Sequence, residues 1–440
     1  MTRLSAPLVL AEVGWMAMGF VDTLFVGRVS AEAIGAVSLG TTIFYGVGIF
    51  ASGLLLGLDT FVARAFCGGD LEGCRRWLIN GIWMALLLMP MVMSLVLASL
   101  PLLTAFGIDR AVLRETGPYI RALNWSAPPL LLYFAFRRYL QSVDMVRPVM
   151  VSLLTANAVN LAGNWILVFG NLGAPRMGVV GSGWATCISR VYMAAVLAAV
   201  IWSSHPKTIG PLVSRAAWHP DLGRIRELLR LGLPAAGQIG LEWGVFATVT
   251  VLIGRLNAEA LAGHQIALIT VSTTFMMPLG ISSAAAVRVG QAIGRGDLAG
   301  AARSGWTALA LGAMVMTSAA LALLIVPRVI ARAFTPDVAI IAAGAVLLRV
   351  AAFFQLFDGL QVVATGALRG AGDTRTPMLC HFGGYWLIGL PLGAVLCFRY
   401  GLGAAGLWIG LSVGLIIIGI VLAGVWKRTA RRFGRTAMIK

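Results

Sequence analysis

Four acidic residues stand inside long apolar segments of the sequence: Glu12, Asp22, Glu242 and Asp358. A charged side chain at the centre of a bilayer costs about 2.5–3.5 kcal/mol, so acids there are rare and usually functional. Such a carboxylate can bind a proton or a cation, or it can hydrogen-bond a neighbouring helix as a structural group. The depth of Asp22, Glu242 and Asp358 favours ion binding, whereas Glu12 is close enough to the end of its segment to reach water.

Amide and hydroxyl side chains accompany these acids at helical spacing. Asn160 and Asn164 are four residues apart and therefore share one face of a helix, and Gln238 stands in the same relation to Glu242. Thr186 lies in the apolar segment that follows the one with Asn160 and Asn164. Hydrogen bonds between helices can explain such residues on their own, so the residue types leave both a structural and a functional interpretation open.

Enzyme motifs are missing or out of context. The GxGxxG pattern at 401–406 precedes an apolar segment without a preceding strand, so it is not predicted to bind a dinucleotide. None of the 4 histidines forms HExxH, and no P-loop is present. The 5 cysteines include no CxxC pair, which argues against a zinc site or a disulfide framework. We therefore predict a protein that is not an enzyme and needs no cofactor.

The elements that must position these residues are membrane helices. The chain is 59% hydrophobic and 12% charged, with a mean hydropathy of +0.88, so lipid must be the solvent for most of it. The first apolar segment is too long for a cleaved signal and is predicted to be retained. Apolar segments of membrane-crossing length predict twelve helices, near residues 7–26, 33–58, 78–101, 119–136, 149–169, 180–202, 233–253, 260–286, 306–326, 343–365, 378–398 and 404–426.

The distribution of basic residues predicts the orientation. The net charge is +17, and most Lys and Arg fall in alternate loops and in the tail, so both termini are expected in the cytoplasm. This rule explains the positive charge without nucleic acid, because no basic stretch is interleaved with exposed aromatic residues.

An internal repeat divides the chain into similar halves. Residues 26–34 (VGRVSAEAI) align with 253–261 (IGRLNAEAL), and 69–71 (GDL) with 296–298 (GDL). We predict an all-α integral membrane protein with twelve transmembrane helices in two six-helix bundles, related by a pseudo-two-fold axis along the membrane normal. The expected segments are an N-terminal lobe (1–202), a cytoplasmic linker (203–230), a C-terminal lobe (231–426) and a basic cytoplasmic tail (427–440).

Several passages together resemble the multidrug and toxic compound extrusion (MATE) transporters, most closely their NorM-like branch, over nearly the whole chain. These passages are FVDT at 20–23, NLAGNW at 160–165, GSGWAT at 181–186, GLP at 232–234 before Glu242, AGHQIA at 262–267, VRVG at 287–290, and Asp358 followed by Gln361 and GALRG at 366–370. The resemblance implies a secondary antiporter that exports lipophilic or cationic drugs in exchange for H⁺ or Na⁺.

The resemblance also implies roles for individual residues. Asp22 with Asn160, Asn164 and Thr186 would form an ion-coupling site in the amino-terminal lobe. The residues expected to bind substrate or a cation, with Na⁺ possible at the two acids, are Glu242, Asp358, Gln355, Gln238 and Gln265. The family often has a tyrosine four residues before the acid of the tenth span, where this chain has Phe354, so the coupling ion stays open.

An alternative from the same superfamily is a flippase for a lipid-linked sugar or polysaccharide. Such relatives usually have more spans and a cationic cavity, for which Arg190 and Arg349 are the candidate buried cations here. The expected partners are organic cations, drugs and the lipid bilayer. We expect a monomer in the bacterial inner membrane.

Overall fold

The computed structural model describes residues 2–105, 110–208 and 218–438, and these residues form helices and short connections without a strand. The helices of the first half are α1 (Thr2–Val26), α2 (Ala31–Leu54), α3 (Gly57–Cys67), α4 (Leu71–Ala105), α5 (Arg110–Asn124), α6 (Ala127–Ser142), α7 (Val146–Phe169), η1 (Asn171–Gly173) and α8 (Val179–Thr208). Those of the second half are α9 (Leu222–Gly254), α10 (Ala258–Gly294), α11 (Leu298–Ile325), α12 (Pro327–Arg332), α13 (Val338–Ala371), α14 (Arg375–His381), η3 (Phe382–Gly389), α15 (Leu390–Ala394), η4 (Val395–Arg399) and α16 (Gly403–Met438).

Membrane-crossing helices dominate the structure. Among the described residues, 11 helical stretches are long and apolar enough to cross a bilayer. The predicted span 119–136 is not among them; its residues belong to α5 and α6, of 15 and 16 residues, which a turn at Trp125 and Ser126 separates. The break has a local cause: Pro128 and Pro129 lack backbone N–H groups and are accommodated in the first turn of a new helix. With this pair counted as one crossing, the all-α membrane fold with twelve spans is confirmed.

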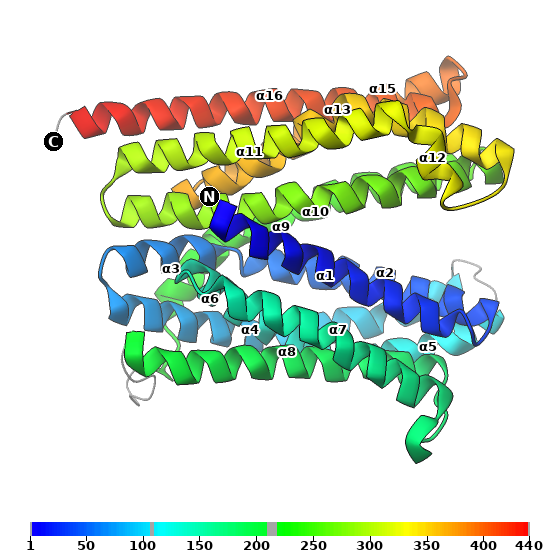
Figure 1. Cartoon of the computed structure of the whole chain (residues 1–440), viewed down its shortest axis with the longest axis horizontal. Helices are drawn as coiled ribbons and strands as arrows, with labels where there is room; N and C mark the ends of the chain where they lie inside the picture. Colours follow the sequence, from blue (N-terminus) through cyan, green and yellow to red (C-terminus); the bar gives the residue numbers. More distant parts are fainter. Residues whose placement is uncertain (1, 106–109, 209–217, 439–440) are drawn as a thin grey trace. The chain divides into compact units, whose positions relative to one another are not determined.

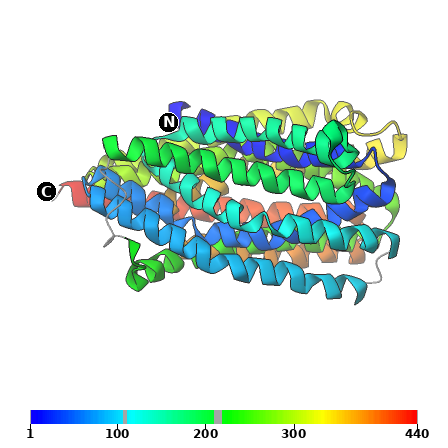
Figure 2. The ribbon, with the colours of Figure 1, turned by 90° about the horizontal axis from the view of Figure 1, so that it is seen from below.

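The chain forms two compact units. One contains Met1–Glu12 and Gly237–Lys440, and the other contains Val13–Ala236. Within each unit the long helices run in nearly the same direction or opposite to it, as Figures 1 and 2 show. Residues 209–217 of the predicted linker lie outside the described residues, and α9 begins at Leu222, inside the predicted linker.

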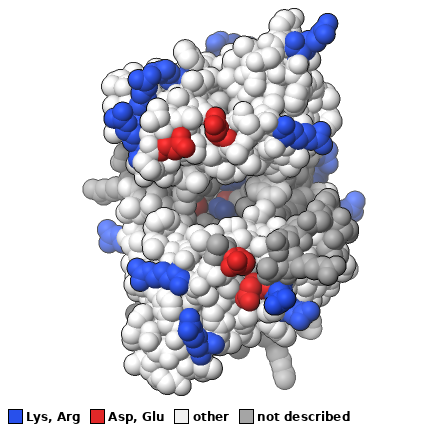
Figure 3. Space-filling view, turned by 90° about the vertical axis from the view of Figure 1, so that its right-hand side faces the viewer, with Lys and Arg blue, Asp and Glu red and all other residues white. Residues whose placement is uncertain are grey.

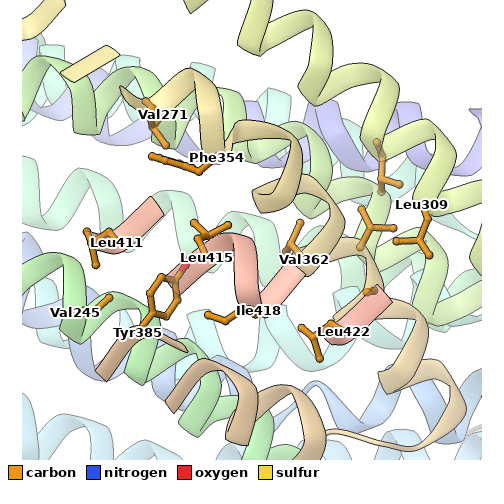
Figure 4. Close-up of a cluster of buried hydrophobic side chains, with 14 of the residues drawn as sticks. Val245, Val271, Leu309, Phe354, Val362, Tyr385, Leu411, Leu415, Ile418 and Leu422 are labelled. Atoms are coloured by element: carbon orange, nitrogen blue, oxygen red, sulfur yellow. The ribbon is translucent and has the colours of Figure 1, made fainter. Parts of the chain in front are cut away.

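Surface charge is sparse, as the composition predicts. Figure 3 shows one end of the molecule, where scattered Lys and Arg side chains and a few acidic ones stand among uncharged residues. In the unit that contains Gly237–Lys440, apolar side chains from α9, α10, α13, η3 and α16 pack into one buried core, part of which is drawn in Figure 4.

The repeat has a structural basis in its helix caps. Ser30 before α2 and Asn257 before α10 are both extended, and each side-chain oxygen accepts a hydrogen bond from the backbone N–H three residues later, at 3.1 and 2.7 Å. Asp70 and Asp297 accept the same bond, at 2.8 and 2.7 Å. Each of these caps satisfies one of the free N–H groups of a helix start, so the aligned motifs build the same turn in both halves.

Candidate functional site

Asp22 lies in a cage of hydrogen-bond donors in the unit Val13–Ala236. Its Oδ1 accepts hydrogen bonds from Asn160 Nδ2 at 3.0 Å and Asn164 Nδ2 at 2.8 Å, and its Oδ2 accepts one from Thr186 Oγ1 at 2.8 Å. Asp22 is 6% exposed, and its partners are buried. All three partners donate, and charge-assisted hydrogen bonds of this kind stabilise an ionised carboxylate.

Three helices position this cage. Asp22 belongs to α1, the two asparagines share one face of α7, and Thr186 comes from α8. α7 and α8 approach closely because Gly163 packs against Ala185, where an added Cβ would lie 3.0 Å from that of Ala185. Asn164 Nδ2 also contacts the Asn160 carbonyl at 3.0 Å, which ties the two amides together. The structure thus brings together the four residues predicted for the amino-terminal lobe.

A buried cation lies one turn along α8 from this cage. Arg190 is 1% exposed, and its guanidinium hydrogen-bonds the Ser126 hydroxyl and, at 3.3 Å, the Tyr45 hydroxyl. The guanidinium carbon also lies 4.7 Å from the centre of the Phe44 ring, within the range of a cation–π interaction. Arg190 is close enough for its charge to act on Asp22. The field of this cation therefore partly compensates the negative charge of the cage.

Glu242 and Asp358 share one donor in the unit that contains Gly237–Lys440. Gln361 Nε2 lies 3.2 Å from Asp358 Oδ1 and 3.5 Å from Glu242 Oε1. Asp358 is 3% exposed, and the Glu242 side chain is 19% exposed. Two carboxylates around one amide donor repel each other unless a proton or a cation lies with them.

His381 extends this cluster to the end of α14. Its Nδ1 lies 2.7 Å from the Pro377 carbonyl oxygen, so this nitrogen carries a hydrogen and donates it. Its Nε2 lies 3.4 Å from Gln238 Nε2 and 3.9 Å from Glu242 Oε2. The cluster of two acids, two amides and an imidazole is called the acid–histidine cluster below; its members are Gln238, Glu242, Asp358, Gln361 and His381.

Other predicted residues lie outside both clusters. Gln355 is buried and donates to the Thr274 hydroxyl, and Gln265 is exposed. Neither has a hydrogen bond with Glu242 or Asp358 among the described residues. Glu12 is 7% exposed and belongs to the same compact unit as the acid–histidine cluster.

His264, in the AGHQIA motif, has both ring nitrogens satisfied. Trp408 Nε1 donates to its Nδ1 at 3.0 Å, and its Nε2 lies 2.8 Å from the Thr250 hydroxyl. The ring is fully buried.

Sequence reasoning assigned no role to two members of the acid–histidine cluster, although it placed Gln361 in the family motif. Gln361 stands three residues after Asp358, and this spacing places both on one helix face, a signal that was present in the sequence. His381 is a lone histidine in an apolar span, and only the packing of α14 brings it near Glu242. Tyr385 was missed as well. Its buried hydroxyl has no hydrogen-bond partner among the described residues, and it lies close enough to Glu242 and Asp358 to interact electrostatically with both.

The donor sets suit protons and hard cations rather than transition metals. Among the described residues, no group of three or more His, Cys, Asp or Glu side chains could hold a metal ion. Carboxylate and amide oxygens are the ligands that hard cations prefer. Binding of Na⁺ at Glu242 and Asp358 therefore stays a prediction, and the oxygen ligands of these side chains are compatible with it.

Removing the hydroxyl donor of the Asp22 cage tests its chemistry. We expect Thr186→Val to lower the rate of ion-coupled dye transport about tenfold, because one charge-assisted hydrogen bond is worth about 1.5–3 kcal/mol. Thr186→Ser keeps the donor and should stay close to the unchanged protein. The measurement is the initial rate in proteoliposomes at a fixed gradient; equal rates for the valine and serine variants would contradict the assignment.

A multi-pass helical membrane protein with buried carboxylates in each of its two units has the features of a secondary transporter. The MatE family model matches residues 7–166 and 234–395, two segments that begin at Pro7 and Pro234, which are 227 residues apart like the aligned motifs of the repeat. The chain belongs to the MatE family, whose members are membrane transporters and not enzymes.

Curated relatives and solved structures agree with this assignment. The chain is 36% identical over 438 residues to a probable multidrug resistance protein NorM of Mesorhizobium japonicum, covering 97% of this chain and 93% of the relative. A relative of the same name from Pseudomonas putida is 36% identical, with 99% and 96% covered. The fold matches a MATE crystal structure in the bent conformation with a TM-score of 0.90 at 19% identity, covering 99% of this chain and 96% of that one. A eukaryotic MATE transporter matches with a TM-score of 0.88 at 20% identity, with 98% and 97% covered.

Proposed function

We propose that this chain is a secondary active antiporter that exports lipophilic or cationic organic compounds in exchange for H⁺ or Na⁺. The observation that carries this proposal is the pair of acids, Glu242 and Asp358, that share the single donor of Gln361. Their repulsion is relieved when a cation joins them, and either a coupling ion or a cationic substrate can provide that charge.

The two buried sites suit different parts of such a cycle. The Asp22 cage has a complete set of donors from Asn160, Asn164 and Thr186, so its carboxylate is stabilised without a ligand. The acid–histidine cluster has fewer donors than its carboxylates can use, so it needs a positive partner. We infer that the cluster exchanges ion for substrate, while Asp22 responds to the coupling ion.

The choice of substrate class follows from the residues and from the relatives. The relatives named above are described as probable multidrug resistance proteins. A carboxylate pair in apolar surroundings favours organic cations that carry a large apolar body. The positive charge of such a molecule can pair with a carboxylate while its apolar body contacts the apolar side chains. We place the protein in the bacterial inner membrane as a monomer with both termini in the cytoplasm, in agreement with the loop charges.

Transport by the purified protein tests the proposal. Proteoliposomes are loaded with buffer at one pH or Na⁺ concentration and diluted into another, and uptake or release of ethidium is followed by fluorescence. One elementary charge moving through 100 mV supplies about 2.3 kcal/mol, enough for measurable accumulation. Dye movement against its gradient is expected with one of the two ions. Dye movement that ignores both gradients would contradict the proposal.

The flippase alternative requires a cationic cavity, and the structure gives little support for one. Of the two candidate buried cations, Arg349 is exposed and Arg190 is buried beside the Asp22 cage. The same proteoliposomes can carry a fluorescent lipid-linked sugar, and its movement between leaflets without any dye transport would favour the flippase.

A further inference from the structure

The ring of His381 is held in one tautomer with its second nitrogen turned to an acid. The hydrogen bond of 2.7 Å from Nδ1 to the Pro377 carbonyl oxygen uses the single N–H hydrogen of the neutral imidazole ring. Nε2 is therefore an acceptor, and it receives the amide hydrogen of Gln238 at 3.4 Å. The side chain is fully buried, so bulk water does not compete for this nitrogen.

Glu242 Oε2 lies 3.9 Å from this acceptor nitrogen. An ionised carboxylate and a lone pair on nitrogen repel each other, whereas a proton between them joins the two groups. A hydrogen bond needs about 2.6–3.2 Å, and such bonds are often long before the working state forms, so a shift of about 1 Å closes the gap. One added proton would therefore join Glu242 and His381 into a hydrogen-bonded carboxyl–imidazole pair.

We propose that His381 shares the coupling proton with Glu242, so that the acid–histidine cluster binds H⁺ through a carboxylate–imidazole pair. This inference rests on the proposed antiport function. In the proton-loaded site the O–H of Glu242 points at Nε2; transfer breaks this O–H bond, forms N–H, and leaves a carboxylate beside an imidazolium. When an organic cation enters, the proton leaves to solvent and the carboxylate pairs with the cation.

The neighbouring side chains fit this role. Gln238 can turn its amide so that the oxygen accepts from the newly protonated Nε2. The ionisable groups next to His381 are Glu242 from α9 and Tyr385 from η3, whose ring centre lies 5.7 Å from that of His381. Asp358 from α13 is linked to Glu242 through Gln361, the donor that both acids share. α16 also packs against α14, and its sequence between Gly403 and Trp426 contains no ionisable residue.

The local backbone is unusual at the same place. η3, of eight residues, is π-helical and begins directly after His381. π-Helical turns are rare and occur often at functional sites, because the extra residue in the turn redirects the side chains around it. Here the turn carries Tyr385, whose ring packs edge-on against His381 at an interplanar angle of 61°.

Proton release on dye binding tests the pair. Purified protein in weak buffer is mixed with ethidium, and a pH indicator reports the protons released per dye bound across a pH series. In the pair the proton is held in a hydrogen bond between the carboxyl oxygen and Nε2, which a lone carboxyl group lacks, so the pair holds the proton more tightly. We expect His381→Gln to move the midpoint of release to lower pH by about one unit, a tenfold weaker hold on the proton.

His264→Gln is the matched control, because His264 is also fully buried but, within the described part of the chain, hydrogen-bonds Trp408 and Thr250 and no acid. It should release protons like the unchanged protein. An unchanged midpoint in His381→Gln with normal dye binding would overturn the role of His381 and leave antiport intact. Absence of proton-linked or sodium-linked dye binding in the unchanged protein would instead overturn the proposed function.

A second measurement does not depend on a variant that folds. The chain has 4 histidines, and ¹⁵N-histidine NMR of the unchanged protein distinguishes the neutral ring from the imidazolium. We expect one buried ring to gain a proton as the pH falls and to lose it when ethidium is added. A buried ring signal that stays in the neutral Nδ1–H form at every pH that supports coupling would contradict the proposal.

Discussion

Proteoliposomes that contain the double variant Asp22→Asn, Asp358→Asn are expected to show no gradient-driven export, with dye movement at the level of passive leak. The unchanged protein should accumulate dye about tenfold for one proton exchanged across one pH unit. Asparagine keeps the size of each side chain and cannot bind a proton or compensate a cation. The measurement is the steady-state dye ratio under an imposed pH or Na⁺ gradient.

A matched pair of substitutions controls for the loss of two acids. Asp297 and Asp337 are exposed caps of α11 and α13, and asparagine caps a helix as well as aspartate does. The variant Asp297→Asn, Asp337→Asn should therefore transport normally. Export at the normal rate by the Asp22, Asp358 variant would exclude these carboxylates from the coupling mechanism.

The second large effect is expected on stability, from Gly366→Val in α13. A Cβ at this position would collide with the carbonyl oxygen and the hydroxyl of Ser282 in α10, and that hydroxyl is already bonded to the Val362 carbonyl at 2.7 Å. Backbone cannot move aside as a flexible side chain can, so the cost exceeds the roughly 1–3 kcal/mol of ordinary overpacking. We expect little folded protein, measured as the monodisperse fraction after size-exclusion chromatography and by thermal unfolding in detergent.

Gly424→Val in α16 is the control for this substitution. Gly424 is exposed, and a Cβ there meets no atom within 4 Å. The variant should behave like the unchanged protein or unfold at a slightly higher temperature, because valine favours the helix more than glycine does. Equal yields from Gly366→Val and Gly424→Val would show that α10 and α13 do not pack as described.

Much of the fold could be predicted from the sequence because membrane helices are specified locally. An apolar segment long enough to cross a bilayer has no stable alternative to a helix, so the spans followed from composition alone. The break near residue 125 was not predicted. Its prolines at 128 and 129 allow either a kink or a new helix start, and only packing against neighbouring helices decides between them.

The sites were predictable to different degrees. The spacing of Asn160 and Asn164 within one helix is enough to predict that they share a face. Their contact with Asp22, which lies on another helix, was implied only by the family resemblance. Gln265 has the same side chain as Gln238 but is exposed. The sequence could not separate the two residues, because it does not show which face of a helix meets the protein interior. His381 joins its cluster through tertiary contacts alone, so no spacing in the sequence could reveal it.

The number of crossings determines whether the two ends of the chain lie on the same face of the membrane, and α5 and α6 affect that number. The described residues contain 11 apolar helical stretches long enough to cross a bilayer, an odd number that would send the carboxyl terminus to the face opposite the amino terminus. Counting α5 and α6 together as one further crossing gives an even number, and an even number of crossings returns the chain to the face on which it began. Reporter proteins fused to either terminus should therefore give the same signal.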